Sequence, residues 1–150
     1  MPVLTGAASA EIDAPIERCW KLVEDVLNAP RWQHGLELVA VVTRDERGRP
    51  LICDTVSDAR FTKVRTRVRF DYEPPQRLTW TQIQSDDLDY MKGGWELERL
   101  GDDRTRVTYT LEVDPGPIGV FARPLERMLR PLVIGGRAKE LARALALEQG

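Results

Sequence analysis

The sequence predicts a single α+β domain built around an antiparallel sheet. Two observations carry this prediction. Between residues 36 and 114, apolar and polar residues alternate with a period of two, which is typical of strands that bury one face. Helical spacing appears only towards the two ends of the chain. A length of 150 residues fits one domain, so residues 1–150 are expected to fold together.

The first elements are a short strand and two helical segments. Alternation over residues 8–13 predicts the strand. Apolar positions recur at helical spacing over residues 15–28, and the proline at position 15 suits a first turn, with Asp13 expected as the cap. Residues 31–34 are expected to add one further short turn before Gly35.

Six further strands are predicted, and proline and glycine separate several of them. The clearest has Val64, Val68 and Phe70 on one side and basic residues on the other. The expected ranges are 36–45, 51–59, 62–73, 77–84, 90–100 and 105–114. Six strands of this length would curl, and a helix is available to cover the concave side.

A long C-terminal helix is predicted after residue 117. Apolar residues recur at helical spacing from Phe121 onward and continue through Leu145. Pro124 and Pro131 are expected to kink this helix, and the pair Gly135-Gly136 to bend it again. These bends would let the helix open as a gate.

Composition excludes several classes of function. A net charge of -2 provides no basic field for nucleic acid, so no nucleic-acid partner is expected. No apolar run approaches the ~20 residues that cross a bilayer, and any membrane contact is expected to be transient. The N-terminus lacks the pattern of a secretory signal, which favours a cytoplasmic location.

The two cysteines and the single histidine offer few residues for metal binding or catalysis. Cys19 and Cys53 are expected to be free thiols in a reducing compartment. A metal site is not expected, because there is no Cys-x-x-Cys pair and His34 is the only histidine. No cofactor is expected. A single histidine also restricts acid–base catalysis near neutral pH.

Five stretches of sequence, taken in order, resemble one family. They are AEIDAPIERCW at residues 10–20, RW at 31–32, YEPPQRLTW at 72–80, GWEL at 94–97 and TRVTY at 105–109. Together they resemble the polyketide cyclase/dehydrase and lipid-transport family of the START-like superfamily, also called SRPBCC. The resemblance covers nearly the whole chain, and it depends on the ordered set rather than on one motif.

The resemblance implies a helix-grip fold. In that fold a seven-stranded curved antiparallel sheet wraps around the long C-terminal helix, with two short helices between strands 1 and 2 and a ligand cavity between sheet and helix. Relatives bind polyketides, quinones, sterols or lipids, and some catalyse cyclisation. Fold alone does not choose among these activities.

The residues expected to contact a ligand are the inward-facing aromatic and polar residues of the strands and the apolar face of the last helix. They are Trp32, Thr55, Phe70, Tyr72, Trp80, Gln82, Met91, Trp95, Tyr109, Phe121, Leu125, Met128 and Leu132. Packing of the aromatic residues into a solid core is the alternative at the same positions.

Polar residues among these positions would orient a ligand. Gln82 continues the face of Trp80, so it would need a ligand, a water or the solvent rim to satisfy its amide. The pattern over residues 51–59 does not decide which face is buried, although Asp54 pointing to solvent would turn Cys53 and Thr55 inward. Tyr109 is the best-placed catalytic candidate, since relatives that cyclise use an inward arginine or tyrosine.

Arg137 is a weaker candidate for the same role, and no strand arginine is expected to face inward. The basic residues from Lys63 to Arg69 are interpreted as a solvated outer face with cross-strand partners. The carboxylates of Asp86, Asp87 and Asp89 are interpreted as solvated loop residues.

Three hypotheses follow. The first is a protein that binds a lipophilic small molecule in the cavity. The second is a cyclase or aromatase acting on a poly-β-ketone, in which holding the chain in one conformation does most of the work. The third is a non-catalytic partner-binding module with a packed core. A monomer or a weak homodimer is expected.

Overall fold

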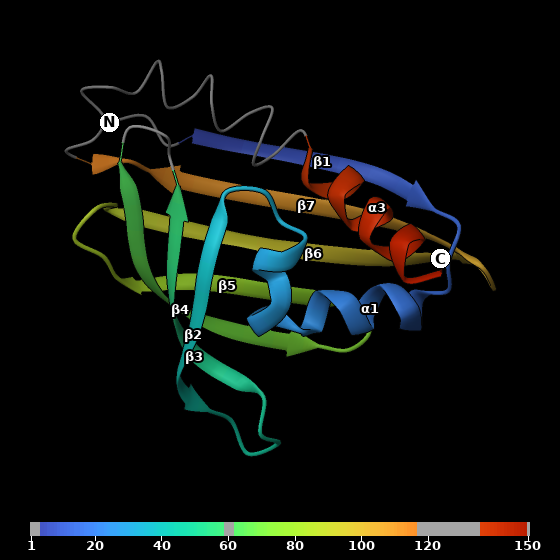
Figure 1. Ribbon diagram of the computed structural model, residues 1–150, viewed down its shortest axis with the longest axis horizontal. Coiled ribbons are helices and arrows are strands. Elements are labelled where there is room, and N and C mark those ends of the chain that lie inside the picture. Colours follow the sequence, from blue (N-terminus) through green and yellow to red (C-terminus); the bar gives the residue numbers. More distant parts are fainter. Residues whose placement is uncertain (1–3, 59–61, 117–135, 150) are drawn as a thin grey trace.

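A computed structural model describes residues 4–58, 62–116 and 136–149. Seven antiparallel strands form one curved sheet, and the described helices lie across one of its faces (Figure 1). The strands are β1 (Leu4–Ile12), β2 (Leu36–Arg44), β3 (Pro50–Asp58), β4 (Lys63–Glu73), β5 (Arg77–Gln84), β6 (Tyr90–Gly101) and β7 (Arg104–Asp114). The helical segments are α1 (Ile16–Glu24), the 3-10 helix η1 (Val26–Arg31) and α3 (Arg137–Gln149).

The sheet has the order β1-β7-β6-β5-β4-β3-β2, which confirms the predicted seven-stranded antiparallel architecture. Consecutive strands from β2 to β7 pair as hairpin neighbours, as short connections favour. β1 crosses to the far side and pairs with β7 from Leu4↔Val113 to Ile12↔Thr105. This long pairing extends β1 four residues before the predicted start at residue 8.

The period-two pattern sets the two faces of the sheet as predicted. On β7, Val107, Tyr109, Leu111 and Val113 are all buried. On the outer face, cross-strand ion pairs join basic residues to carboxylates, including Arg67 with Asp54 and Lys63 with Glu37. The outer-face interpretation of the basic stripe is therefore confirmed for these two residues, and the sheet presents its apolar side to the helices.

Two local predictions near the N-terminus are wrong. The helix begins at Ile16, so Asp13 lies too early to cap it, and the N-cap position is Pro15 with no side-chain cap. The helix also ends at Glu24, because Asp25 has φ -80° and ψ 67° and leaves the helical region. The second helical segment is η1, which spans Val26–Arg31. It therefore lies earlier in the chain than the short turn predicted over residues 31–34.

α3 lies over the β1 and β7 side of the sheet and beside α1. Its buried apolar residues include Ala138, Leu141 and Leu145, as the helical spacing predicted. Arg18 of α1 donates from Nη2 to the carbonyl of Leu145 at 3.0 Å, which ties the two helices together. The predicted earlier part of this helix and its proline bends lie outside the described residues.

None of the helices in the described ranges is long and apolar enough to cross a membrane.

Candidate ligand-binding cavity

A cavity of about 160 Å³ lies between the concave face of the sheet and the helical layer. Its sheet wall comes from β2 to β7, and α1, η1, the segment from residue 33 to 35 and the first residue of α3 line the rest of it. Apolar and aromatic side chains dominate the lining. An apolar cavity of about 150 Å³ is large enough for benzene, so this volume suits a body of one ring.

Aromatic rings form a continuous row along the sheet side of the cavity. Phe70 and Trp80 have ring centroids 6.4 Å apart, and Trp80 and Tyr109 are separated by 5.8 Å. Trp95 meets Tyr109 edge-on at 5.0 Å. Tilted and edge-on contacts at these distances are favourable, so the rings hold one another in place and leave a preformed wall.

A polar group interrupts this wall where α3 begins. Arg137 is 4% exposed and lines the cavity with its guanidinium carbon 5.7 Å from the centre of the Tyr109 ring. Burial raises the pKa of Tyr109, and the nearby positive charge of Arg137 opposes part of that rise. The phenol is therefore a proton donor at neutral pH rather than a base.

Six of the predicted ligand-contacting residues line the cavity together. They are Thr55, Phe70, Trp80, Met91, Trp95 and Tyr109. Trp32 lies behind this lining, with its ring 5.8 Å from that of Trp95 and its buried Nε1 without a hydrogen-bond partner. The predicted residues Phe121, Leu125, Met128 and Leu132 lie outside the described residues.

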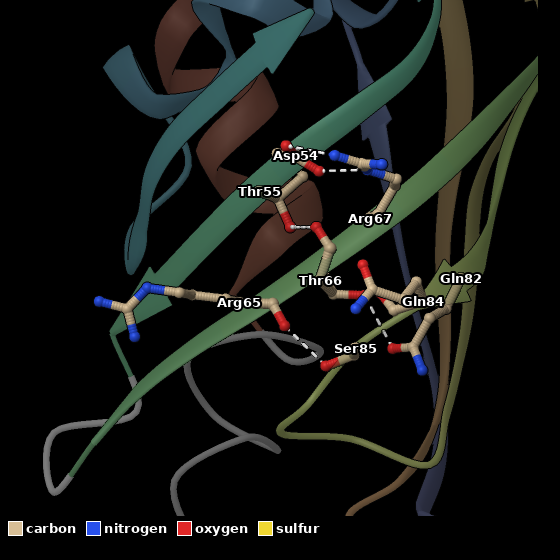
Figure 2. Close-up of polar contacts among 8 residues, drawn as sticks. All are labelled: Asp54, Thr55, Arg65, Thr66, Arg67, Gln82, Gln84 and Ser85. Carbon is tan, nitrogen blue, oxygen red and sulfur yellow. Dashed lines mark hydrogen bonds and ion pairs between the residues drawn. The ribbon is translucent and has the colours of Figure 1, made fainter. Parts of the chain in front are cut away.

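Gln82 and Tyr72 are not among the residues that line the cavity. The Gln82 amide accepts from Thr66 Oγ1 at 2.8 Å and donates to the carbonyl of Leu88 at 2.9 Å, so protein groups supply the partners it needed. Figure 2 shows this contact across β4 and β5, beside the Asp54–Arg67 ion pair. The Tyr72 hydroxyl donates to the carbonyl of Pro50 at 2.6 Å.

The sequence left open which face of β3 is buried, and the structure decides it. Cys53 and Thr55 are buried, while Asp54 faces outward to Arg67. Thr55 Oγ1 donates to the carbonyl of Thr66 at 3.3 Å, so its hydroxyl is used within the sheet (Figure 2). Both cysteines are free thiols, and burial raises the pKa of Cys53 to about 11. A thiol so held is a poor nucleophile.

Sequence reasoning missed the setting of Arg137. Its Nη1 donates to Glu140 Oε1 at 2.8 Å and to the carbonyl of His34 at 3.0 Å. Glu140 Oε2 in turn accepts from the His34 amide at 2.5 Å. The spacing of three residues between Arg137 and Glu140 was the available signal, but such pairs usually lie on exposed helix surfaces.

Among residues 4–58, 62–116 and 136–149, no group of three or more histidine, cysteine, aspartate or glutamate side chains could hold an ion.

A curved antiparallel sheet that packs over a C-terminal helix, with an apolar cavity beneath it, defines the START-like class of domains, whose fold binds hydrophobic ligands. Within this class the chain belongs to the polyketide cyclase/dehydrase and lipid transport family, whose profile matches residues 4–146. The resemblance seen in the sequence is thereby confirmed.

Solved structures similar to this chain support the same fold. A protein from Thermus thermophilus has a TM-score of 0.80 at 22% identity, with 98% of this chain and 100% of that chain covered. A START superfamily protein from Mycobacterium smegmatis has a TM-score of 0.77 at 18% identity, with coverage of 96% and 98%. The Zhui aromatase/cyclase from Streptomyces sp. R1128 has a TM-score of 0.75 at 17% identity, with coverage of 98% and 93%.

No curated protein matches the sequence.

Proposed function

We propose that this protein binds a lipophilic small molecule in the cavity between the sheet and the helical layer. The observation that carries the proposal is a cavity of about 160 Å³ with an aromatic wall and one buried arginine on its lining among the described residues. Small-molecule sites are usually concave, mostly apolar and supplied with few polar groups. The third hypothesis, a packed core, does not account for a void several times the ~30 Å³ of one water.

Burial of apolar surface supplies the affinity in this proposal. Each Å² removed from water contributes roughly 25 cal/mol, and the preformed ring wall keeps the cost of ordering side chains low. Thr55 and Gln82 are already bonded within the protein, so the orienting role falls on Tyr109 and Arg137.

Tryptophan fluorescence tests the proposal. Trp80 and Trp95 line the cavity, whereas Trp20 is buried on α1 and is not part of the lining. A one-ring quinone such as dimethylbenzoquinone is expected to quench the emission of the wild-type protein saturably. The variant W80F/W95F should lose that saturable component, and the matched control W20F should keep it. Linear quenching in the wild type, like that produced by acrylamide, would contradict the proposal.

Cyclisation of a poly-β-ketone is a second candidate function. The observation that favours it is the buried pair of donors, Tyr109 and Arg137, within a mostly apolar cavity. Such donors stabilise the charge that develops on a carbonyl oxygen when a carbon–carbon bond forms. Tyr109, as a protonated phenol, would be the catalytic donor.

A further inference from the structure

The cavity meets solvent beside residues 33–35, the segment that joins η1 to β2. Among the lining residues that the structure describes, His34 and Asp58 are the two that are exposed, and the others are buried or half-buried. Arg137, the first residue of α3, also lines the cavity and is bonded to His34. This segment, which we call the strap, therefore lies on the rim of the cavity, against the start of α3.

Two side chains of α3 hold the strap by its backbone. Arg137 Nη1 donates to the His34 carbonyl at 3.0 Å, and Glu140 Oε2 accepts from the His34 amide at 2.5 Å. The two side chains also form an ion pair at 2.8 Å and are 5% and 13% exposed. We call this pair the clamp. Because it bonds to main-chain atoms, its hold on the strap does not depend on the imidazole of His34.

Gly35 separates the clamped residue from the sheet. Its φ of +87° lies in the left-handed region, which glycine enters without strain. Its carbonyl accepts from the Asp58 amide at 2.8 Å, where the pairing of β2 with β3 begins. Hinges in proteins are a few residues at the end of an element that absorb changes in φ and ψ. Gly35 is such a position, so the strap can turn there while β2 stays paired.

Release of the strap leaves no unpaired charge behind. His34 is already exposed, so its amide and carbonyl reach water when they leave α3. Arg137 and Glu140 remain bonded to each other, and a paired charge avoids the large cost of an isolated one. Among the described residues, the hydrogen bonds that join α3 to the strap are the two at His34, each strengthened by a charge. The closed form is therefore favoured, and opening is local.

We infer that the strap is a gate to the cavity and that the Arg137–Glu140 clamp holds it shut, so that a ligand enters and leaves when the strap turns away from α3. The gating role rests on the proposed function, whereas movement of the strap needs no ligand. Arg137 and Glu140 act here as positioning residues, because they set the conformation of the rim through the backbone of His34.

Hydrogen exchange of the His34 amide, followed by NMR on the full chain without ligand, tests the clamp. The variant Glu140→Gln has a single acceptor oxygen, which serves Arg137 or the His34 amide but not both. Exchange at His34 is expected to accelerate about tenfold or more relative to the buried Val107 of β7, as loss of one charge-assisted hydrogen bond implies. Lys139→Gln, at an exposed position of α3, is the matched control and should keep the wild-type rates.

A second variant keeps the test decisive if Glu140→Gln weakens the whole fold. The double variant Arg137→Met/Glu140→Leu removes the clamp and leaves no unpaired charge, a change that folded proteins often accept. It should also accelerate exchange at His34 by about tenfold or more relative to Val107. A wild-type rate at His34 in this variant, or a rise shared equally by Val107, would overturn the clamp.

Stopped-flow quenching of tryptophan emission by dimethylbenzoquinone tests the gate. A gate changes how often a ligand crosses the rim in both directions. The association and dissociation rate constants of Glu140→Gln should therefore rise by the same factor, about tenfold. Kd should stay within about twofold of the wild type, because the closed strap still predominates. Lys139→Gln should keep both wild-type rate constants.

The outcomes separate the gate from the proposed function. Faster exchange at His34 with unchanged rate constants would mean that the ligand enters elsewhere, and would overturn the gate. A weaker Kd with an unchanged association rate constant would assign the clamp to ligand contact and overturn the gate as well. Absence of saturable quenching in the wild type would overturn the proposed function together with the gate, while exchange at His34 still decides the clamp.

Discussion

Tyr109 is the residue at which the apolar wall of the cavity meets the buried arginine. Its ring contacts Trp80 and Trp95, and it is 3% exposed. Burial raises the pKa of the phenol, so the hydroxyl stays protonated and able to donate above neutral pH. If Tyr109 acts in cyclisation, it does so through its hydroxyl group.

Tyr109→Phe tests that role. If the protein cyclises a poly-β-ketone, turnover of a polyketone mimic should fall about a hundredfold, because a positioned donor to a developing oxyanion contributes on that order. The substitution conserves the ring, so the melting temperature should change little. Turnover equal to the wild type would exclude Tyr109 as the catalytic donor, and a large fall in melting temperature would assign it a structural role.

At the scale of single residues, the sequence predicted which face of the sheet a side chain points to better than it predicted that side chain's hydrogen-bond partners. Alternation placed Phe70, Trp80 and Tyr109 on the inner face, because strand side chains alternate strictly. It could not show that the Gln82 amide bonds to Thr66 on the neighbouring strand and to the carbonyl of Leu88, since the first contact depends on strand register and the second on a loop conformation.

The burial of Arg137 is a second feature that could not be predicted from the sequence. A charged residue on a helix is usually solvated, but here the His34 carbonyl and the Tyr109 ring both lie against the Arg137 guanidinium.

At the scale of elements, the pairing of β5 with β6 shapes the cavity wall. Gly93 lies opposite Trp80 in the register of these strands. A Cβ atom on Gly93 would come within 2.5 Å of Trp80 Cζ2, so the indole rests directly on the glycine backbone. The missing side chain of β6 is what lets the Trp80 ring occupy its place in the wall.

Gly93→Ala is expected to displace the Trp80 ring and to destabilise the protein by about 1–3 kcal/mol, as overpacking does. Ligand binding should weaken with it. Gly101→Ala is the matched control at the other end of β6, where a Cβ meets nothing within 4 Å. Its effect on the free energy of unfolding should stay below about 1 kcal/mol. Chemical denaturation checks both, and equal effects of the two variants would contradict the account.

Strands were predicted more accurately than helices. The range of β5, residues 77–84, agrees with the structure, because proline and alternation define it locally. Between Asp13 and His34 the observed helices differ from the predicted ones, because the chain leaves the helical conformation at Asp25 and divides into α1 and η1. The apolar spacing of a helix continues through a 3-10 turn, so the pattern alone does not report the break.

At the scale of the whole molecule, the fold follows from sequence order, whereas the cavity does not. Seven amphipathic strands and a terminal helix allow few antiparallel arrangements. Whether their inner faces meet or leave a void depends on sheet curvature and on where α3 begins, and both are properties of the packed chain. The same aromatic residues would suit a solid core or a cavity wall.

A crystal structure determined under xenon pressure tests the central claim most directly, because xenon occupies apolar cavities that exclude water. We expect a xenon site bounded by Phe70, Trp80, Met91 and Leu111, and its displacement when acetophenone is soaked into the crystal. Side chains that fill this space, with no xenon there, would contradict a cavity built to receive a ligand.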